Sequence, residues 1–131
     1  MLDCYNFLGV NLKFRARSGT LGLQGDLRRM DMSDSDVCPM CGSVNEDVVH
    51  FLFECPQYES ERTVFFYEIH QMYINEDADY LYNMFLAKPN FIKAINILDA
   101  EPNDNSLNAH LDVILKSFLK TTVHLRFQNF Y

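Results

Sequence analysis

Three cysteines and a histidine near the middle of the chain have the types and spacing of metal ligands. The pattern is C-x2-C-x8-H-x4-C, formed by Cys38, Cys41, His50 and Cys55. Two cysteines separated by two residues can bind one ion in a tight turn, and Gly42 permits the backbone angles that such a turn requires. A Cys3His set suits tetrahedral zinc and leaves no coordination position open for water. The pattern therefore predicts one structural Zn²⁺ ion.

Other interpretations of the four residues remain open. They are also compatible with buried cysteines beside a core histidine, or with a C-x-x-C redox pair. A redox pair requires a strand before the motif and a regular helix after it, whereas the acidic run MDMSDSD precedes Cys38. The spacing favours metal binding in a reducing compartment. Cys4 is left over and is predicted to be a small buried residue or a surface thiol.

The segment between the ligands is acidic and apolar. Its acidic residues are Glu46, Asp47 and Glu54. An acidic neighbour can fix the tautomer of a ligating imidazole, so each is a candidate partner for His50. Phe51 and Phe53 lie beside the ligands in the sequence. We interpret them as core residues in preference to platforms on which bases stack.

We recognise neither a secretory signal nor a membrane span in the sequence. The run MLDCYNFLGVNLKFRARSG lacks a basic region followed by an apolar stretch and a cleavage site. No stretch approaches the roughly 20 apolar residues that cross a bilayer. We therefore expect an intracellular protein, in the nucleus or the cytoplasm, with no membrane partner.

The elements that must position the ligands are predicted to be helices. Apolar residues recur with a period near 3.6 in segments at 2–17, 56–74, 78–87, 91–100 and 106–131. The last segment is the most regular, and its apolar face comprises Leu107, Leu111, Ile114, Leu115, Phe118, Leu119, Thr122 and Leu125. An alternating run, VVHFLFEC, overlaps the ligands. We predict a mainly α fold, a small helical domain with an embedded Cys3His zinc knuckle-like module.

Three parts are predicted along the chain: a basic N-terminal helix and loop at 1–36, a zinc module running into a helix at 37–73, and C-terminal helices packing on it at 74–131. The charges behind the net value of −7 are unevenly distributed along the chain, because residues 1–30 hold five basic and two acidic side chains. A surface that binds RNA or DNA would therefore lie towards the N-terminus. Its candidate residues are Arg15, Arg17, Arg28 and Arg29. These arginines are equally compatible with a solvated basic face, or with ion pairs to the acidic remainder of the chain.

The run CPMCGSVNEDVVHFLFECPQYESER resembles the zinc-binding segment at the C-terminal end of non-LTR retrotransposon reverse transcriptases. That family has a C-P-x-C motif, an acidic pair, a histidine before three apolar residues, a Cys-Pro pair and a closing arginine. The matching elements are Cys38-Pro39, Cys41-Gly42, Glu46-Asp47, His50-Phe51-Leu52-Phe53, Cys55-Pro56 and Arg62. The basic run FRARSGTLGLQGDLRRM is similar to the stretch before the first cysteine of the family. The resemblance covers about residues 8–70.

The catalytic motifs of the family have no recognisable counterpart in this sequence. The sequence has no tyrosine-x-Asp-Asp hairpin, which a reverse transcriptase needs to hold two divalent metals, and the chain is too short to place a nuclease site. We therefore do not expect an enzyme. The resemblance implies a non-catalytic zinc-binding domain derived from a reverse transcriptase, which helps to engage RNA or DNA. Two alternatives remain: a zinc-stabilised module whose acidic helical body binds a protein, and a nonfunctional fragment of such an element.

Overall fold

Helices make up all the regular structure of the described residues, which are 11–100 and 106–127 of a computed structural model. No strand occurs within these ranges, so the predicted mainly α fold is confirmed. The alternating run VVHFLFE is helical too and contains a π turn at His50–Glu54. None of the helices in these ranges is both long enough and apolar enough to cross a membrane.

The helices follow the predicted segments closely. Residues 11–18 form a first helix. The helices after it are α2 Gln24–Arg29, α3 Glu59–Asn75, α4 Asp79–Leu86, α5 Asn90–Leu98 and α6 Ser106–Phe127. A 3-10 turn at Pro56–Tyr58 leads into α3, as expected for proline at a helix start. The predicted helical positions 2–10 and 128–131, and Cys4 with them, lie outside the described residues.

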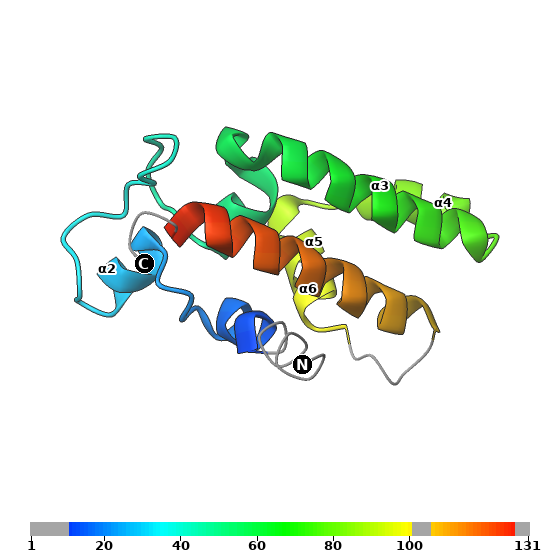
Figure 1. The fold of residues 1–131 in the computed structure, drawn as a ribbon, viewed down its shortest axis with the longest axis horizontal. Coiled ribbons are helices and arrows are strands. Elements are labelled where there is room, and N and C mark those ends of the chain that lie inside the picture. The colour runs from blue at the N-terminus through cyan, green and yellow to red at the C-terminus, as the bar shows by residue number, and fades with distance from the viewer. Residues whose placement is uncertain (1–10, 101–105, 128–131) are drawn as a thin grey trace.

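α3 and α6 lie side by side and run in opposite directions (Figure 1). Phe65 of α3 and Phe118 of α6 stack, with ring centroids 4.5 Å apart. The ring of Phe51, which follows His50 in sequence, meets Phe118 edge to face at 6.4 Å. Phe51 is fully buried, in agreement with its interpretation as a core residue. One aromatic cluster therefore joins the ligand segment to the two longest helices.

The buried face of α6 agrees with the predicted periodicity except at its end. The buried predicted positions are Leu111, Leu115, Phe118, Leu119 and Thr122. The half-buried ones are Leu107, Ile114 and Leu125. Arg126, which the apolar pattern did not include, is also buried. A charged side chain at this depth requires a partner, and the partner belongs to the ligand segment described below.

α4 and α5 complete the helical layer behind α3 and α6 (Figure 1). The imidazole of His70 on α3 stacks on the Tyr82 ring of α4 at 4.2 Å. The Nε2 atom of His70 lies 2.7 Å from a carboxylate oxygen of Asp79. On α5, Ile97 is fully buried where this helix packs against α6.

A buried ion pair attaches the first helix to α6. The ammonium group of Lys13 donates to the carboxylate of Asp112 and, at 2.7 Å, to the backbone oxygen of Ala100. Lys116 donates to the same carboxylate at 2.6 Å. Burial opposes ionisation of Asp112, but the hydrogen bonds from Lys116 and Lys13 outweigh it and lower the pKa of this carboxyl. Lys13 is therefore part of the core of the fold and is not available to a nucleic-acid phosphate.

We predict that Asp112→Asn lowers the free energy of unfolding by about 3 kcal/mol at pH 6, because it leaves the buried Lys13 without its counter-charge. The folded pKa of Asp112 lies below its unfolded value of about 3.9. The stabilisation is therefore complete above that pH and is lost as the pH falls towards the folded pKa. Urea denaturation from pH 7 to pH 3.5 should show the difference between wild type and variant shrinking at the acidic end.

The control is Asp99→Asn, which removes an exposed carboxylate 3.2 Å from Arg17. An exposed pair of this kind contributes less than about 1 kcal/mol. Equal effects of the two substitutions would contradict a special role for the Lys13–Asp112 pair.

Candidate metal centre

The four predicted ligand side chains lie together. One ligand atom from each of Cys38, Cys41, His50 and Cys55 lies within 4.8 Å of all the others. The sulfurs of Cys38 and Cys55 are 3.9 Å apart, and the Cys41 sulfur is 3.4 Å from His50 Nε2. In a tetrahedron with Zn–S near 2.3 Å and Zn–N near 2.0 Å, neighbouring ligand atoms are about 3.5–3.8 Å apart. The cluster can therefore hold one metal ion after a small contraction.

A tight turn brings the first two cysteines to one side of the cluster. The Gly42 amide donates to the Cys38 oxygen, and the Cys38 amide donates to the Ser43 oxygen, each at 2.8 Å. Gly42 has a φ of +82°, while a side chain there would meet nothing within 4 Å. The glycine is therefore required by the backbone angle and not by lack of space, as the sequence predicted.

A widened helical turn brings the last two ligands to the other side. The Cys55 amide donates to the His50 oxygen at 2.8 Å, the five-residue bond of a π turn. This turn places residues five apart on the same side of the backbone. The Asp47 carboxylate accepts the backbone N–H of His50 at 2.9 Å and so stabilises the start of the turn. Of the acidic residues near His50, Asp47 therefore orients the backbone and not the ring.

Glu54 is the acidic residue that faces the imidazole. The Nδ1 atom of His50 lies 3.9 Å from Glu54 Oε1, while Nε2 points to the Cys41 sulfur. At 3.9 Å the contact is electrostatic and is longer than a hydrogen bond. It favours the tautomer with the proton on Nδ1, which leaves Nε2 free to bind a cation.

The three thiols differ in acidity. Burial raises the pKa of Cys38 and of Cys55. Burial also opposes ionisation of Cys41, but hydrogen bonds from the side chain and backbone of Ser43 outweigh it and lower the pKa of that thiol to about 6. Cys41 is therefore the thiol that loses its proton most readily, while burial makes an ion displace protons from the other two.

The metal loop, defined here as residues 38–55, is attached to the rest of the fold through Glu46. This residue is fully buried, and its carboxylate accepts two hydrogen bonds from Arg126 on α6, at 2.6 and 2.8 Å. The same carboxylate accepts the backbone N–H of Gln24, at the start of α2, at 2.7 Å. Burial alone lowers the pKa of Arg126, but the hydrogen bonds to Glu46 outweigh it and raise this pKa.

The backbone of Glu46 makes a second link to α2. Its oxygen accepts the Gly25 amide at 2.8 Å, and a side chain at position 25 would lie 2.7 Å from that oxygen. Only glycine permits this approach. From the sequence, Glu46 was predicted as a candidate partner of His50, and Arg126 was not predicted to be its partner. The available signal was the position of Arg126 at i+7 from Leu119 and i+4 from Thr122, on the buried face of α6.

The four arginines proposed for phosphate contact are placed on two neighbouring elements. Arg15 and Arg17 lie on the helix of residues 11–18, Arg28 and Arg29 lie on α2, and all four are exposed. Arg17 pairs with Asp99 at 3.2 Å, Arg28 with Asp36 at 3.2 Å and Arg29 with Asp26 at 3.5 Å. Ion pairs with acidic residues, one of the alternatives that the sequence left open, therefore occur at three of the four positions.

The chain is similar in part to a protein of a mobile element. It is 47% identical over 45 residues to the retrovirus-related Pol polyprotein from type-1 retrotransposable element R1 of Bradysia coprophila. The matched segment is 34% of this chain and 4% of that polyprotein. Over this segment the chain is related to a retrotransposon polyprotein. No protein-family model and no solved structure matches the chain.

We predict that Arg126→Met lowers the free energy of unfolding by about 3–5 kcal/mol, because the Glu46 charge is then buried without a partner. Glu46→Gln in the same background should recover part of the loss, since a buried neutral amide costs less than a buried carboxylate. Urea denaturation at constant metal concentration measures both.

The matched control is Arg28→Met, which removes an exposed partner of Asp36 and should cost less than about 1 kcal/mol. If Arg126→Met were no more destabilising than this control, Glu46 would not be the attachment point of the metal loop.

Proposed function

We propose that Cys38, Cys41, His50 and Cys55 bind one structural Zn²⁺ ion. The observation that carries this proposal is a closed set of four soft and borderline donors at nearly tetrahedral spacing. The Cys38 and Cys55 side chains are fully buried, and His50 is 5% exposed. Such a site leaves no position for a reacting water, which supports a stabilising role over a catalytic one. Four convergent ligands also favour a metal over a two-cysteine redox pair.

Under this proposal, the chain is a non-catalytic, zinc-stabilised domain derived from a retrotransposon reverse transcriptase. The partial identity to the R1 polyprotein supports the origin. The metal would hold the tight turn of Cys38 and Cys41 against the π turn of His50 and Cys55. It would thereby keep Glu46 in place for α2 and α6. Zinc therefore stabilises the site that joins the elements of the fold.

Metal analysis of the purified protein should give one zinc per chain, and Cys41→Ser should abolish stoichiometric binding. The matched control is Cys4→Ser, which removes the cysteine outside the ligand pattern and should retain one zinc. Co²⁺ in place of zinc should give the visible spectrum of a tetrahedral thiolate site in wild type and in the control. Circular dichroism should show a chelator destabilising wild type, as for other structural zinc sites. A Cys41→Ser variant with unchanged zinc content or unchanged stability would disprove the proposal.

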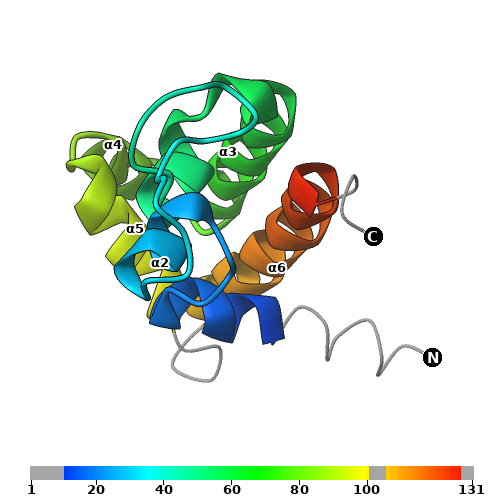
Figure 2. The ribbon, with the colours of Figure 1, turned by 90° about the vertical axis from the view of Figure 1, so that its left-hand side faces the viewer.

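The exposed arginines support a second candidate function, the binding of single-stranded nucleic acid. The side chain of Arg29 donates to the Gly19 oxygen at 2.7 Å, which joins α2 to the end of the helix of residues 11–18. Figure 2 shows these two elements next to each other, so the four exposed arginines belong to neighbouring helices. The Arg17–Asp99 pair is exposed on both sides and therefore weak, so a phosphate can replace this carboxylate at little cost. The acidic partners of Arg28 and Arg29 are more buried, so a phosphate there is a second partner of the exposed guanidinium and does not replace the carboxylate.

Titration of a labelled single-stranded RNA at several salt concentrations tests this function. Four phosphate contacts predict a slope of log K against log salt of about −3, and Arg28→Ala with Arg29→Ala should reduce its magnitude by about 1.4. Lys88→Ala with Lys93→Ala removes the same charge from another region and should leave the slope unchanged. Absence of binding at low salt, or equal effects of the two double variants, would exclude this surface.

A further inference from the structure

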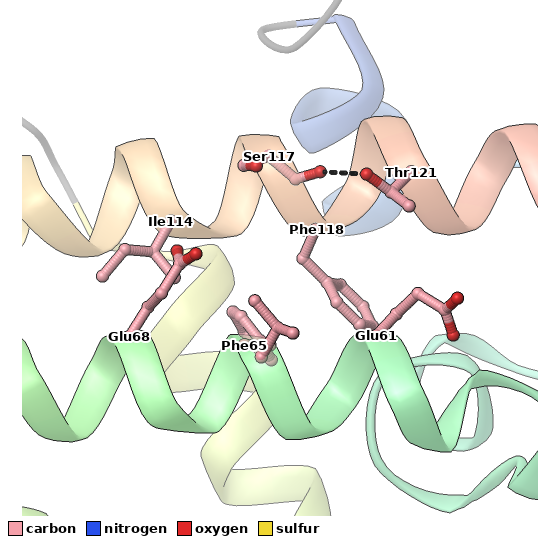
Figure 3. A pocket seen from close by; sticks show the side chains of 8 residues that line it. Glu61, Phe65, Glu68, Ile114, Ser117, Phe118 and Thr121 are labelled. Carbon is pink, nitrogen blue, oxygen red and sulfur yellow. Dashed lines mark hydrogen bonds between the residues drawn. The ribbon is translucent and has the colours of Figure 1, made fainter.

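A groove with an apolar floor lies between α3 and α6. Its floor is formed by the stacked rings of Phe65 and Phe118 and by Ile114 (Figure 3). The side chain of Val64 also lines this hollow, which has a volume of about 140 Å³, and is 55% exposed. The two rings are only 2% and 5% exposed, so the apolar surface open to water at this place comes from Val64 and the half-buried Ile114.

The groove continues along the same pair of helices. Glu68 and Ile114 line the first hollow and also a second one of about 300 Å³, to which Tyr67 and Val113 contribute. These last two side chains are 64% and 65% exposed. From Glu61 to Asn75, at the two ends of the groove, α3 rises by about 20 Å, or nearly four turns. This length matches a helix of about 14 residues.

The groove has a negative edge and a neutral edge. Glu61 and Glu68 lie on the α3 side, seven residues and thus about 10 Å apart, and both are half-buried. Neither forms an ion pair within the described part of the chain. Ser117 and Thr121 of α6 line the other side, and the Thr121 hydroxyl donates to the backbone oxygen of Ser117 at 3.2 Å (Figure 3). The neighbouring Arg62 interacts with Glu61 electrostatically, but no ion pair among the described residues neutralises either carboxylate. Half-buried carboxylates of this kind favour a cationic ligand and repel phosphate.

We propose that this groove binds an amphipathic, basic helix of a partner protein. Apolar side chains of that helix, at spacings of three and four residues, cover the floor of the groove. Two Lys or Arg side chains seven residues apart meet Glu61 and Glu68. The proposal extends beyond the metal centre and the arginine surface, and it depends on neither.

A second copy of this chain fits the groove less well. Each copy has a net charge of −7, and a symmetric contact would bring two sets of the same glutamates together. Like charges brought together across an interface oppose association. The same negative charges attract a basic partner.

The test uses a fluorescein-labelled helical peptide of Leu, Ala and Lys, with Leu at i, i+3, i+4 and i+7 and two Lys seven residues apart. Fluorescence anisotropy should show saturable binding to the zinc-loaded full chain, and little binding of the same peptide with Glu in place of Lys. Glu61→Gln with Glu68→Gln should weaken binding by about tenfold. Asp31→Asn with Asp34→Asn removes the same charge from the exposed loop after α2 and should change binding by less than twofold. Asparagine tolerates the φ of +58° at position 31.

Val64→Ser with Val113→Ser tests the apolar part of the groove. Both side chains are more than half exposed, so the fold should survive, and peptide affinity should fall at least fivefold. Val44→Ser, at an equally exposed position in the metal loop, should have no effect. Failure of wild type to bind the Lys peptide would overturn the proposal, as would equal losses in groove and control variants. Self-association in analytical ultracentrifugation that the Val64 and Val113 changes abolish would assign the groove to a second copy instead.

Discussion

The fold depends on one carboxylate, that of Glu46, which is removed from water and must therefore be paired. The guanidinium of Arg126 meets both of its oxygens, and the first amide of α2 meets one of them. Because Glu46 lies between Cys41 and His50, the same residue sets the path of the metal loop, the start of α2 and the position of the last turn of α6. A displacement of any of these elements by a few ångströms would leave a buried charge without a partner.

The Glu46–Arg126 pair does more to select one arrangement of the helices than to lower the net free energy of folding. Removing two charges from water costs several kcal/mol, and a well-made ion pair only recovers that cost. The alternatives are much worse, because a shifted α6 would present an apolar side chain to Glu46. The Lys13–Asp112 pair acts in the same way at the other end of α6, where it positions the first helix. Two buried ion pairs thus define the register of a helix that apolar packing alone would allow to slide.

The helices and the ligand set were accessible to sequence analysis because each depends on local spacing. Periodic apolar positions located α3 to α6, and the cysteine and histidine spacing located the cluster. The π turn was not predicted, since VVHFLFEC alternates like a strand and only the loop and the core that surround it select the wider turn. The partners of Glu46 and Lys13 were not predicted either. They lie 80 and 99 residues away, and no local pattern states which distant element will approach. For the same reason, the acidic partner of Arg17, which lies on a distant part of the chain, could be anticipated only as a class.

The distribution of contacts along the chain also implies an order of assembly. The four candidate ligands span residues 38–55, so bringing them together closes a short loop at low entropic cost. The guanidinium that neutralises Glu46 lies 80 residues later. During synthesis the ligand cluster can therefore form while α6 is still inside the ribosome, and Glu46 remains hydrated until α6 emerges. The nascent chain thus passes through a stage with a closed loop and an accessible carboxylate, which the arrival of α6 brings to an end.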